Sequence, residues 1–337
     1  MSESSGIEWC DSTFNPWVGC TKISPACDHC YAEGWAKRSG LVKWGNEPRR
    51  RTSESNWREP LKWQATAEQF EREHGHRRRV FCASLADVFD NQVPMEWRND
   101  LWSLIERCWG LDWLLLTKRP QNIEKMLPDA PTWENIRGHV WLGTTVEDQQ
   151  RAGQNIPHLL KHDSAVRFLS CEPLLGPISL ANMRYGKVVL NPLLGMSEGP
   201  SDAIRALLGH DAFMPIDWVI AGGESGPHAR PSHPDWFRSL RDQCAAAGVP
   251  FLFKQWGEWA PHTPVAGGDL GGEVRRGKAT IVHPTGQSDV EVFNATGRNT
   301  IKGSRYMARI GKKSAGRLLD GIEHNGFPNI DHARAAA

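Results

Sequence analysis

The chain has 337 residues, enough for one large domain of up to roughly 250 residues with an appendage. Hydrophobic residues make up 39% and charged residues 23%, as in ordinary globular proteins, and the formal net charge of +1 gives no overall attraction to nucleic acids or membranes. The first residues lack the apolar segment of a signal peptide, and no run approaches the roughly 20 apolar residues of a membrane span, so we expect a cytoplasmic protein without membrane contact.

Three closely spaced cysteines are the first distinctive feature along the chain: Cys20, Cys27 and Cys30. Cys27 and Cys30 are separated by two residues and can direct their thiolates at one centre, to which Cys20 can return across a loop that contains Pro25. Thiolates select zinc or iron–sulfur clusters, and cytoplasmic cysteines are better explained as ligands than as disulfides. A [4Fe–4S] cluster held by three thiolates keeps one iron open for a substrate or cofactor. The segment therefore predicts such a cluster.

Other ligand sets fit the same segment. A structural zinc site needs four protein ligands, and Cys10 or His29 could complete it. Cys10 could instead be the fourth ligand of a closed iron–sulfur cluster in a redox or sensing protein. The three cysteines could also be unrelated core residues. We assign the cysteines that fall within predicted strands and helices to the core: Cys82, Cys108, Cys171 and Cys244.

Two arginine clusters, Arg49–Arg51 and Arg77–Arg79, flank a charged stretch that contains tryptophans. Such clusters are usually solvated surface, but arginine and tryptophan side chains together also suit contacts with phosphates and bases. This stretch is the basis in the sequence for expecting DNA or RNA as a partner.

Six short apolar runs follow, and they begin at Val80, Trp113, Val140, Val166, Trp218 and Phe251. Their length and continuous hydrophobicity are typical of strands buried on both faces of a parallel sheet. Helical patterns lie between them, over residues 95–109, 120–127, 148–161 and 234–247. The alternation predicts an α/β fold, a parallel (β/α) partial or closed barrel, with a flat doubly wound sheet as the alternative. A further strand or a loop is expected around the first cysteines.

Polar and glycine residues follow these strands, and ligands of such folds bind at the carboxyl ends of the strands. Lys118 and Arg119 could hold a carboxylate or a phosphate there, with a surface salt bridge as the alternative. Lys254 and Gln255 are further candidates for substrate contacts. The remaining residues that follow strands are Ser84, Asp87, Thr117, Thr144, Thr145, Glu147, Cys171, Glu172, Gly222, Gly223 and Glu224.

We expect a core over residues 1–259 that carries the three-cysteine motif. Prolines and glycines, with a short helical pattern around 203–208, predict an insertion near residues 191–215. The texture changes after residue 259, so residues 260–337 are expected to form a small C-terminal appendage with a glycine-rich loop.

Several segments of the chain resemble a phage-associated family of uncharacterised proteins with a three-cysteine motif. They are FNPWVGCTKISPACDHCYAE, LTKRP, GTTVE, SCEPLLG, GGESG, FKQWGEW and GKKSAGRLLDG. These matches run from about residue 8 to 320. The family in turn distantly resembles radical S-adenosylmethionine (SAM) enzymes, which implies a radical-SAM-like barrel, SAM as a cofactor and an electron donor as a partner. In those enzymes a glycine-rich, acidic motif meets the SAM amino group.

The same resemblance implies a set of cofactor-binding residues, namely Gly222, Gly223, Glu224, Thr144 and Glu172, with Glu147 as another carboxylate for this task. A tight strand-to-loop turn is the alternative explanation of Gly222 and Gly223. The leading hypothesis is an iron–sulfur enzyme of radical-SAM type that modifies nucleic acid. The alternatives are a zinc-stabilised nucleic-acid-binding protein without catalysis and a redox or sensor protein whose cluster does not meet SAM.

Overall fold

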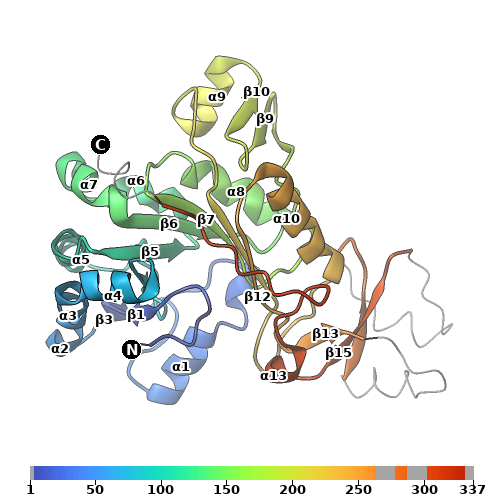
Figure 1. Cartoon of the computed structure of the whole chain (residues 1–337), viewed down its shortest axis with the longest axis horizontal. Coiled ribbons are helices and arrows are strands. Elements are labelled where there is room, and N and C mark those ends of the chain that lie inside the picture. The colour runs from blue at the N-terminus through green and yellow to red at the C-terminus, as the bar shows by residue number, and fades with distance from the viewer. Residues whose placement is uncertain (1–3, 263–277, 287–301, 331–337) are drawn as a thin grey trace.

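A computed structural model describes residues 4–262, 278–286 and 302–330. Its core is a parallel sheet with the strand order β1-β4-β5-β6-β7-β11-β12 (Figure 1). The strands are β1 (Ser12–Phe14), β4 (Arg78–Cys82), β5 (Leu111–Thr117), β6 (Val140–Thr145), β7 (Val166–Cys171), β11 (Trp218–Gly222) and β12 (Phe251–Gln255). The six predicted strands are all present, and β1 is the strand expected beside the first cysteines.

From β1 to β12, the strands of this sheet lie side by side in the same order in which they occur along the chain, so the strand order never reverses. A doubly wound sheet would contain a switch point at which the order reverses. Within the described residues β1 and β12 are the two edges and do not pair with each other. The structure therefore confirms the α/β class and the partial barrel, and it excludes the doubly wound sheet.

The predicted helices lie between the strands as α5 (Met95–Arg107), η2 and α6 (Pro120–Asn122 and Ile123–Met126), α8 (Gln149–Leu159) and α10 (Pro234–Ala247). Helix α10 begins with Pro234 in its first turn and ends at Gly248, whose φ of 70° is left-handed. The sequence did not predict α1 (Tyr31–Ser39), α2 (Glu54–Trp57), α3 (Glu59–Ala65), α4 (Ala67–His74), α7 (Ala130–Ile136), η1 (Pro25–Cys27) and η3 (Arg137–His139).

Alternate residues of the strands face two different hydrophobic cores. The outer face packs against the helices through side chains such as Val80, Leu115 and Phe253. The concave face is filled by Trp9 and by strand side chains, namely Phe81, Leu114, Trp141, Phe168, Trp218, Ile220 and Leu252. Gly143 makes room for the Phe168 ring, since a Cβ atom there would lie 2.3 Å from it. Aromatic packing thus fills the inside of the half-barrel.

The chain between β7 and β11 forms a separate layer with strands β8 (Met183–Tyr185), β9 (Val188–Asn191) and β10 (Met196–Glu198) and helix α9 (Ser201–Leu208). The predicted insertion at 191–215 covers β10 and α9, but the layer begins further upstream, at β8. Short strands β2 (Trp17–Val18) and β3 (Arg50–Arg51) pair near the cysteines.

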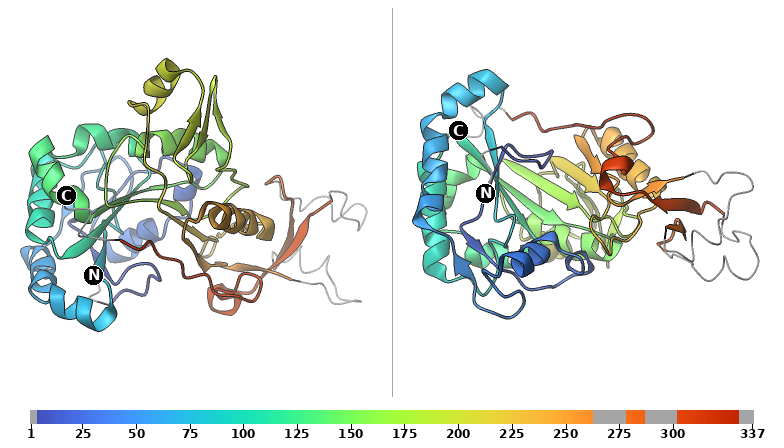
Figure 2. Two further views of the ribbon diagram at one scale, coloured as in Figure 1. Left: turned by 45° about the horizontal axis from the view of Figure 1, so that its top comes forward. Right: turned by 90° about the horizontal axis from the view of Figure 1, so that it is seen from below.

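A small antiparallel sheet follows the core, made of β13 (Trp259–Pro261), β14 (Ala279–Val282) and β15 (Arg305–Arg309), and then α13 (Lys312–Ala315). Most of the predicted glycine-rich loop lies outside the described residues. Figure 2 shows the last segment, in red, returning from this small sheet across the molecule. None of the helices in the described ranges is long and apolar enough to cross a bilayer.

The returning segment binds the open edge of the sheet. The Phe253 amide donates to the His324 carbonyl over 2.9 Å, and the Gly326 amide donates to the Phe251 carbonyl over 3.0 Å. The Trp218 indole donates to the Gly326 carbonyl over 2.7 Å, and the Phe327 ring lies 5.1 Å from the Trp218 ring. The end of the chain is therefore part of the core packing, although it follows the small sheet in sequence.

Candidate functional site

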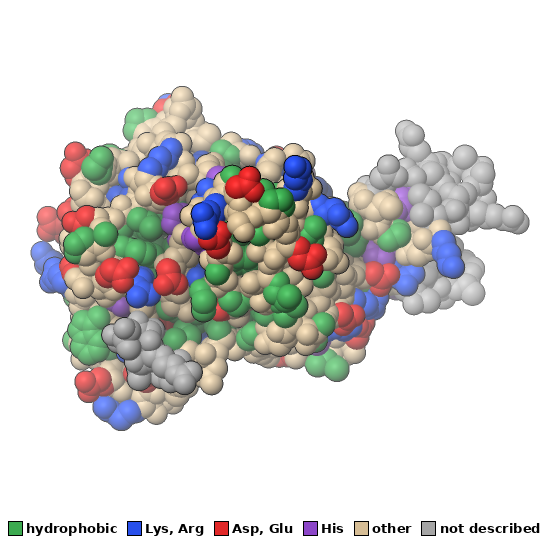
Figure 3. All heavy atoms as spheres, turned by 90° about the horizontal axis from the view of Figure 1, so that it is seen from above, with side chains coloured by type: hydrophobic (Ala, Val, Ile, Leu, Met, Phe, Trp, Pro, Cys, Tyr) green, Lys and Arg blue, Asp and Glu red, His purple; other side chains and the backbone are tan. Residues whose placement is uncertain are grey.

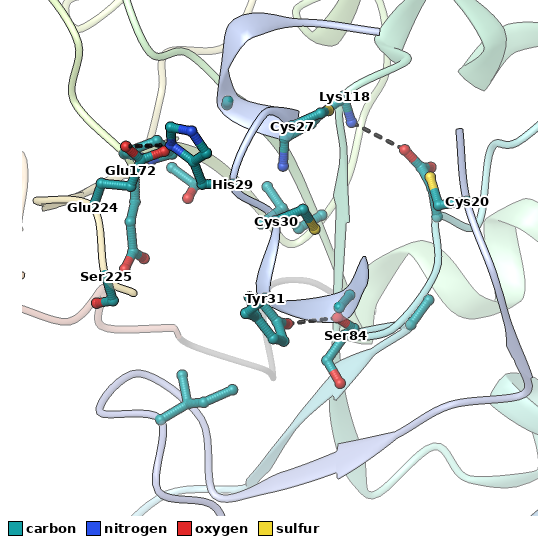
Figure 4. Close-up of a pocket in the computed structure, with 18 of the residues that line it drawn as sticks. Cys20, Cys27, His29, Cys30, Tyr31, Ser84, Lys118, Glu172, Glu224 and Ser225 are labelled. Carbon is teal, nitrogen blue, oxygen red and sulfur yellow. Dashed lines mark hydrogen bonds and ion pairs between the residues drawn. The ribbon is translucent and has the colours of Figure 1, made fainter. Parts of the chain in front are cut away.

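A cavity of about 350 Å³ opens at the carboxyl ends of the parallel strands. This volume lies within the range of small-molecule sites. Most of the predicted site residues line it: Cys20, Cys27, Cys30, Lys118, Arg119, Glu172, Gly223, Glu224, Lys254 and Gln255. Figure 4 shows the three cysteines, with His29 turned toward Glu224 and Tyr31 toward Ser84. The strand-end prediction thus brings together side chains that are far apart in the sequence.

The three cysteines belong to one loop, residues 20–30, which we call the cysteine loop. None of them is in a disulfide; Cys27 is buried, and Cys20 and Cys30 are half-buried. Within the described residues, no three His, Cys, Asp or Glu side chains converge on a point where they could hold one metal ion. Three thiols outside any disulfide are a donor set that both zinc and iron–sulfur clusters accept.

Arg119 anchors the first end of the cysteine loop. Its Nη1 donates to the Cys20 Sγ over 3.4 Å and to Asp87 Oδ2 over 3.1 Å, and its Nη2 donates to the Thr21 carbonyl over 2.9 Å. Burial raises the pKa of Cys20 to about 11; Asp87 adds to this rise, and Arg119 opposes it. Arg119 is thus an ion-paired group that also contacts the thiol, rather than a surface salt bridge.

Lys118 adds a second positive charge to the cavity. Burial alone would lower the pKa of Lys118, but the negative charges of Cys27, Cys30 and Glu147 outweigh burial and raise it. Lys118 is therefore a cation held beside two of the three cysteines.

Glu147 anchors the middle of the cysteine loop from the end of β6. The Ala26 amide donates to its Oε1 over 3.2 Å, and the Glu147 residue is 1% exposed. This carboxylate does not line the cavity. It binds the backbone beside Cys27 instead of a ligand.

Glu224 anchors the second end of the loop together with Arg230. The His29 Nδ1 lies 3.1 Å from Glu224 Oε2, and the Arg230 guanidinium makes hydrogen bonds of 2.6 and 2.9 Å to the same carboxylate. Burial alone would raise the pKa of Glu224, but the hydrogen bonds from Arg230 and His29 outweigh burial and lower it. The carboxylate is therefore an ionised, paired group.

Gly223 allows two strand-end loops to cross closely. A Cβ atom at this position would lie 1.9 Å from the Trp256 carbonyl oxygen. On the other side of the crossing, Gly257 has a φ of 79°, and a Cβ atom there would lie 2.1 Å from the Glu224 carbonyl oxygen. Close backbone packing is sufficient to explain why these positions are glycines.

Glu172 and Lys254 form an ion pair inside the cavity, with 2.7 Å between Lys254 Nζ and Glu172 Oε1. Gln255 Nε2 lies 3.4 Å from the same oxygen. Among the described contacts of this pair, no donor reaches Glu172 Oε2. One carboxylate oxygen therefore faces the cavity unpaired.

Besides Glu147, other predicted residues lie outside the cavity lining, among them Thr144, Gly222 and Cys10. The buried Thr144 hydroxyl donates to the Thr117 carbonyl over 3.0 Å. Cys10 lies in the concave aromatic core, its thiol is 3.3 Å from the Ser5 hydroxyl, and burial raises its pKa to about 12. Cys10 also borders a different hollow, which places it apart from the cysteine loop.

The arginine clusters have mainly structural contacts. Arg49 is buried, and its Nε donates to Asp90 over 2.7 Å. Arg51 stacks 4.0 Å from the Trp57 ring and Arg78 stacks 4.1 Å from the Phe70 ring. Three of the six arginines thus have structural contacts, and nucleic-acid binding by this stretch stays a prediction. The face drawn in Figure 3 mixes acidic and basic side chains.

Several lining residues were not among the predicted site residues, namely Tyr31, Trp44, Ser225 and Lys312. Tyr31 follows Cys30 directly, is 61% exposed and donates its hydroxyl to the Ser84 carbonyl. The ring is thus fixed at one end with its face open to the cavity. Its position beside Cys30 was the available signal, whereas no spacing rule pointed to Lys312 or to Arg230.

No curated protein matches the sequence. The chain is similar to a cysteine-to-serine mutant of spore photoproduct lyase, with 12% identity and a TM-score of 0.36 over 71% of this chain and 62% of that one. It is also similar to a double mutant of that lyase with bound AdoMet and dinucleoside spore photoproduct, with 12% identity and a TM-score of 0.34 over 68% of this chain and 60% of that one.

The chain thus spans about three fifths of the length of these lyase structures. The sequence model of one family, described as a protein of unknown function (DUF5131), matches residues 4–328. The match covers nearly the whole chain, and the protein therefore belongs to this uncharacterised family.

Proposed function

We propose that the protein holds a [4Fe–4S] cluster through Cys20, Cys27 and Cys30 and is an enzyme of radical-SAM type. One observation carries the proposal: three cysteines of one loop, none in a disulfide, line a cavity at the carboxyl edge of a parallel half-barrel. When bound, such a cluster would pass one electron from an external donor to SAM, which would divide into methionine and a 5′-deoxyadenosyl radical able to abstract hydrogen from the substrate.

The surrounding residues have roles that fit this group. Lys118 and Arg119 offset the negative charge of the three thiolates, and the Arg119 contact to the Cys20 Sγ adds a hydrogen bond to sulfur. The unpaired oxygen of Glu172 can accept a hydrogen bond from an ammonium group, and Lys254 beside it can hold a carboxylate. An amino-acid group such as that of SAM carries both charges.

We propose DNA or RNA as the substrate class. The support lies in the cavity. Tyr31 presents an open aromatic face on which a base can stack, and Trp44 and the exposed Lys312 border the same cavity. Tyr31 directly follows Cys30 in the chain, so a base that stacks on Tyr31 would lie close to the proposed cluster.

The test is anaerobic reconstitution followed by metal analysis and spectroscopy with and without SAM. We expect iron and sulfide near four per chain, as in a [4Fe–4S] centre, and an EPR signal of the reduced cluster that changes when SAM is added. Cys20→Ala, Cys27→Ala and Cys30→Ala should each lose the cluster. Cys10→Ala is the matched control and should keep it.

Two outcomes would contradict the proposal. Tight zinc with no cluster under any reconstitution would leave a zinc-stabilised protein. A cluster that is lost in Cys10→Ala and does not respond to SAM would indicate a closed, four-cysteine centre for redox or sensing. DNA and RNA oligonucleotides are the first substrates to screen once SAM cleavage is detected.

A further inference from the structure

Arg230 contacts the cysteine loop at two points and is linked to a third through Glu224, although it lies about 200 residues further along the chain. Its Nη2 donates to the Pro25 carbonyl over 2.8 Å, and its Nη1 donates to Asp28 Oδ2 over 3.1 Å. Its third contact runs through Glu224, which also binds His29. These contacts bracket Cys27, so the position of that thiol depends on Arg230.

Most of the hydrogen-bonding capacity of Glu224 is used within the protein. Its Oε1 accepts from Arg230 Nη2 over 2.6 Å, and its Oε2 accepts from the Arg230 amide and Nε over 2.7 and 2.9 Å and also contacts His29. The side chain is 5% exposed. A ligand amino group at this carboxylate would therefore compete with contacts that hold the cysteine loop.

We propose that Arg230 and Glu224 form a clamp that fixes the cysteine loop on the end of β11, with Arg230 as a positioning residue for the three thiols. The effect of the clamp on cluster binding rests on the proposed function, because the clamp acts by presenting Cys27 and Cys30 to the cluster. It also assigns Glu224 to the protein framework, in contrast to the cofactor-binding role that the sequence suggested.

The chemistry of the clamp requires arginine. Its guanidinium is planar and directs several N–H groups at once, here to a carboxylate, a backbone carbonyl and Asp28. Lysine supplies the charge without this fork, so Arg230→Lys should restore only part of the clamp. Glu224→Gln keeps the size of the side chain and removes the charge.

The experiment measures how fast the reconstituted cluster loses iron to a chelator under anaerobic conditions. We expect release about tenfold faster in Arg230→Gln, as the loss of charge-assisted hydrogen bonds implies, and a smaller increase in Arg230→Lys. Glu224→Gln should behave like Arg230→Gln, and the double variant should be no worse than either, because both changes break the same unit. The matched control is Arg238→Gln, which removes an arginine of α10 that is paired with Asp320.

A second measurement needs no cluster. Hydrogen exchange of amides 24–30 in the metal-free protein should be faster in Arg230→Gln and Arg230→Lys than in the wild type, and unchanged in Arg238→Gln. If the wild type binds no cluster, the proposed function fails while this exchange still tests the clamp. Unchanged iron release and unchanged exchange in the Arg230 variants would overturn the clamp. A Glu224→Gln protein that keeps its cluster normally but loses the response to SAM would also overturn it, and would make Glu224 a cofactor ligand.

Discussion

Asp112 is a buried carboxylate at the start of β5, at the end of the sheet opposite the cavity. It is 2% exposed, and burial raises its pKa to about 7, while Arg77 and Arg79 oppose the rise. Between its ordinary pKa of 3.8 and about 7, the folded chain holds a proton that the unfolded chain releases. The free energy of unfolding therefore falls as pH rises through this window, and this group adds no further pH dependence above it.

We predict that Asp112→Asn removes part of this pH dependence. At pH 8 the variant should be more stable than the wild type by about 1–3 kcal/mol, since each unit of pKa shift corresponds to roughly 1.4 kcal/mol. At pH 4 the two proteins should be nearly equal. Urea unfolding at both pH values measures the difference. The exposed Asp202→Asn variant is the control, and equal gaps between variant and wild type at both pH values would contradict the assignment.

Gly223 offers a sharper steric test. Alanine at this position places a Cβ atom 1.9 Å from the Trp256 carbonyl oxygen, so the two strand-end loops must separate. We expect Gly223→Ala to lower the free energy of unfolding by more than about 2 kcal/mol, as overpacking does. Gly153→Ala is the matched control, because no atom lies within 4 Å of its Cβ position in α8, and it should stabilise the protein by about 0.5–1 kcal/mol. Thermal unfolding distinguishes the two variants. Equal melting midpoints for Gly223→Ala and Gly153→Ala would show that the two strand-end loops can move apart without loss of stability.

At the scale of elements, the returning C-terminal segment closes the concave core. The Phe327 ring lies between Trp218, at 5.1 Å, and the Arg79 guanidinium, at 4.0 Å. We expect Phe327→Ala to destabilise the protein by about 2–3 kcal/mol, somewhat less than a fully buried phenylalanine would. Ile322→Ala, at an exposed position of the same segment, should change stability by under about 0.5 kcal/mol. Chemical denaturation gives both values, and equal effects would mean that the segment does not pack on the core in solution.

The six main strands were predictable because both of their faces are buried, which requires continuous apolar runs such as Leu111–Thr117. Strand β1 has only three residues and was therefore not distinguishable from a loop. Helices α2, α3 and α4 were missed because they have only four, seven and eight residues, so their few buried residues, such as Trp63 and Phe70, do not form a clear helical stripe.

The candidate site was predictable to the extent that it follows from topology. Parallel strands bring their carboxyl ends to one edge, so Lys118, Glu172 and Lys254 were expected together, and all three line the cavity. Which of the two cavity-lining carboxylates is held by the cysteine loop was not predictable. Glu224 and Glu172 look equivalent in sequence, and only the three-dimensional pairing with Arg230 or Lys254 distinguishes them.

For the whole molecule, the position of the cysteines outside both hydrophobic cores predicts that folding does not need the metal centre. Cys20, Cys27 and Cys30 are absent from the two core clusters of the described residues. We expect metal-free protein to keep the far-ultraviolet circular dichroism of the reconstituted protein, with a melting temperature lower by only a few degrees, the mass-action effect of a bound group. A structural zinc site would instead unfold the protein when the metal is removed. Unfolded metal-free protein would therefore contradict this prediction.

The anchors of the cysteine loop also set an order of events during biosynthesis. The cysteines leave the ribosome early, but Arg119 follows Cys20 by 99 residues, Glu147 follows Ala26 by 121 and Arg230 follows Pro25 by 205. Because a chain folds as it is synthesised from its N-terminus, the loop lacks its full set of anchors until Arg230 has been made. Its thiols are then exposed to oxidants, and the delivery of iron and sulfide to a finished site has to wait until the second half of the chain has been made.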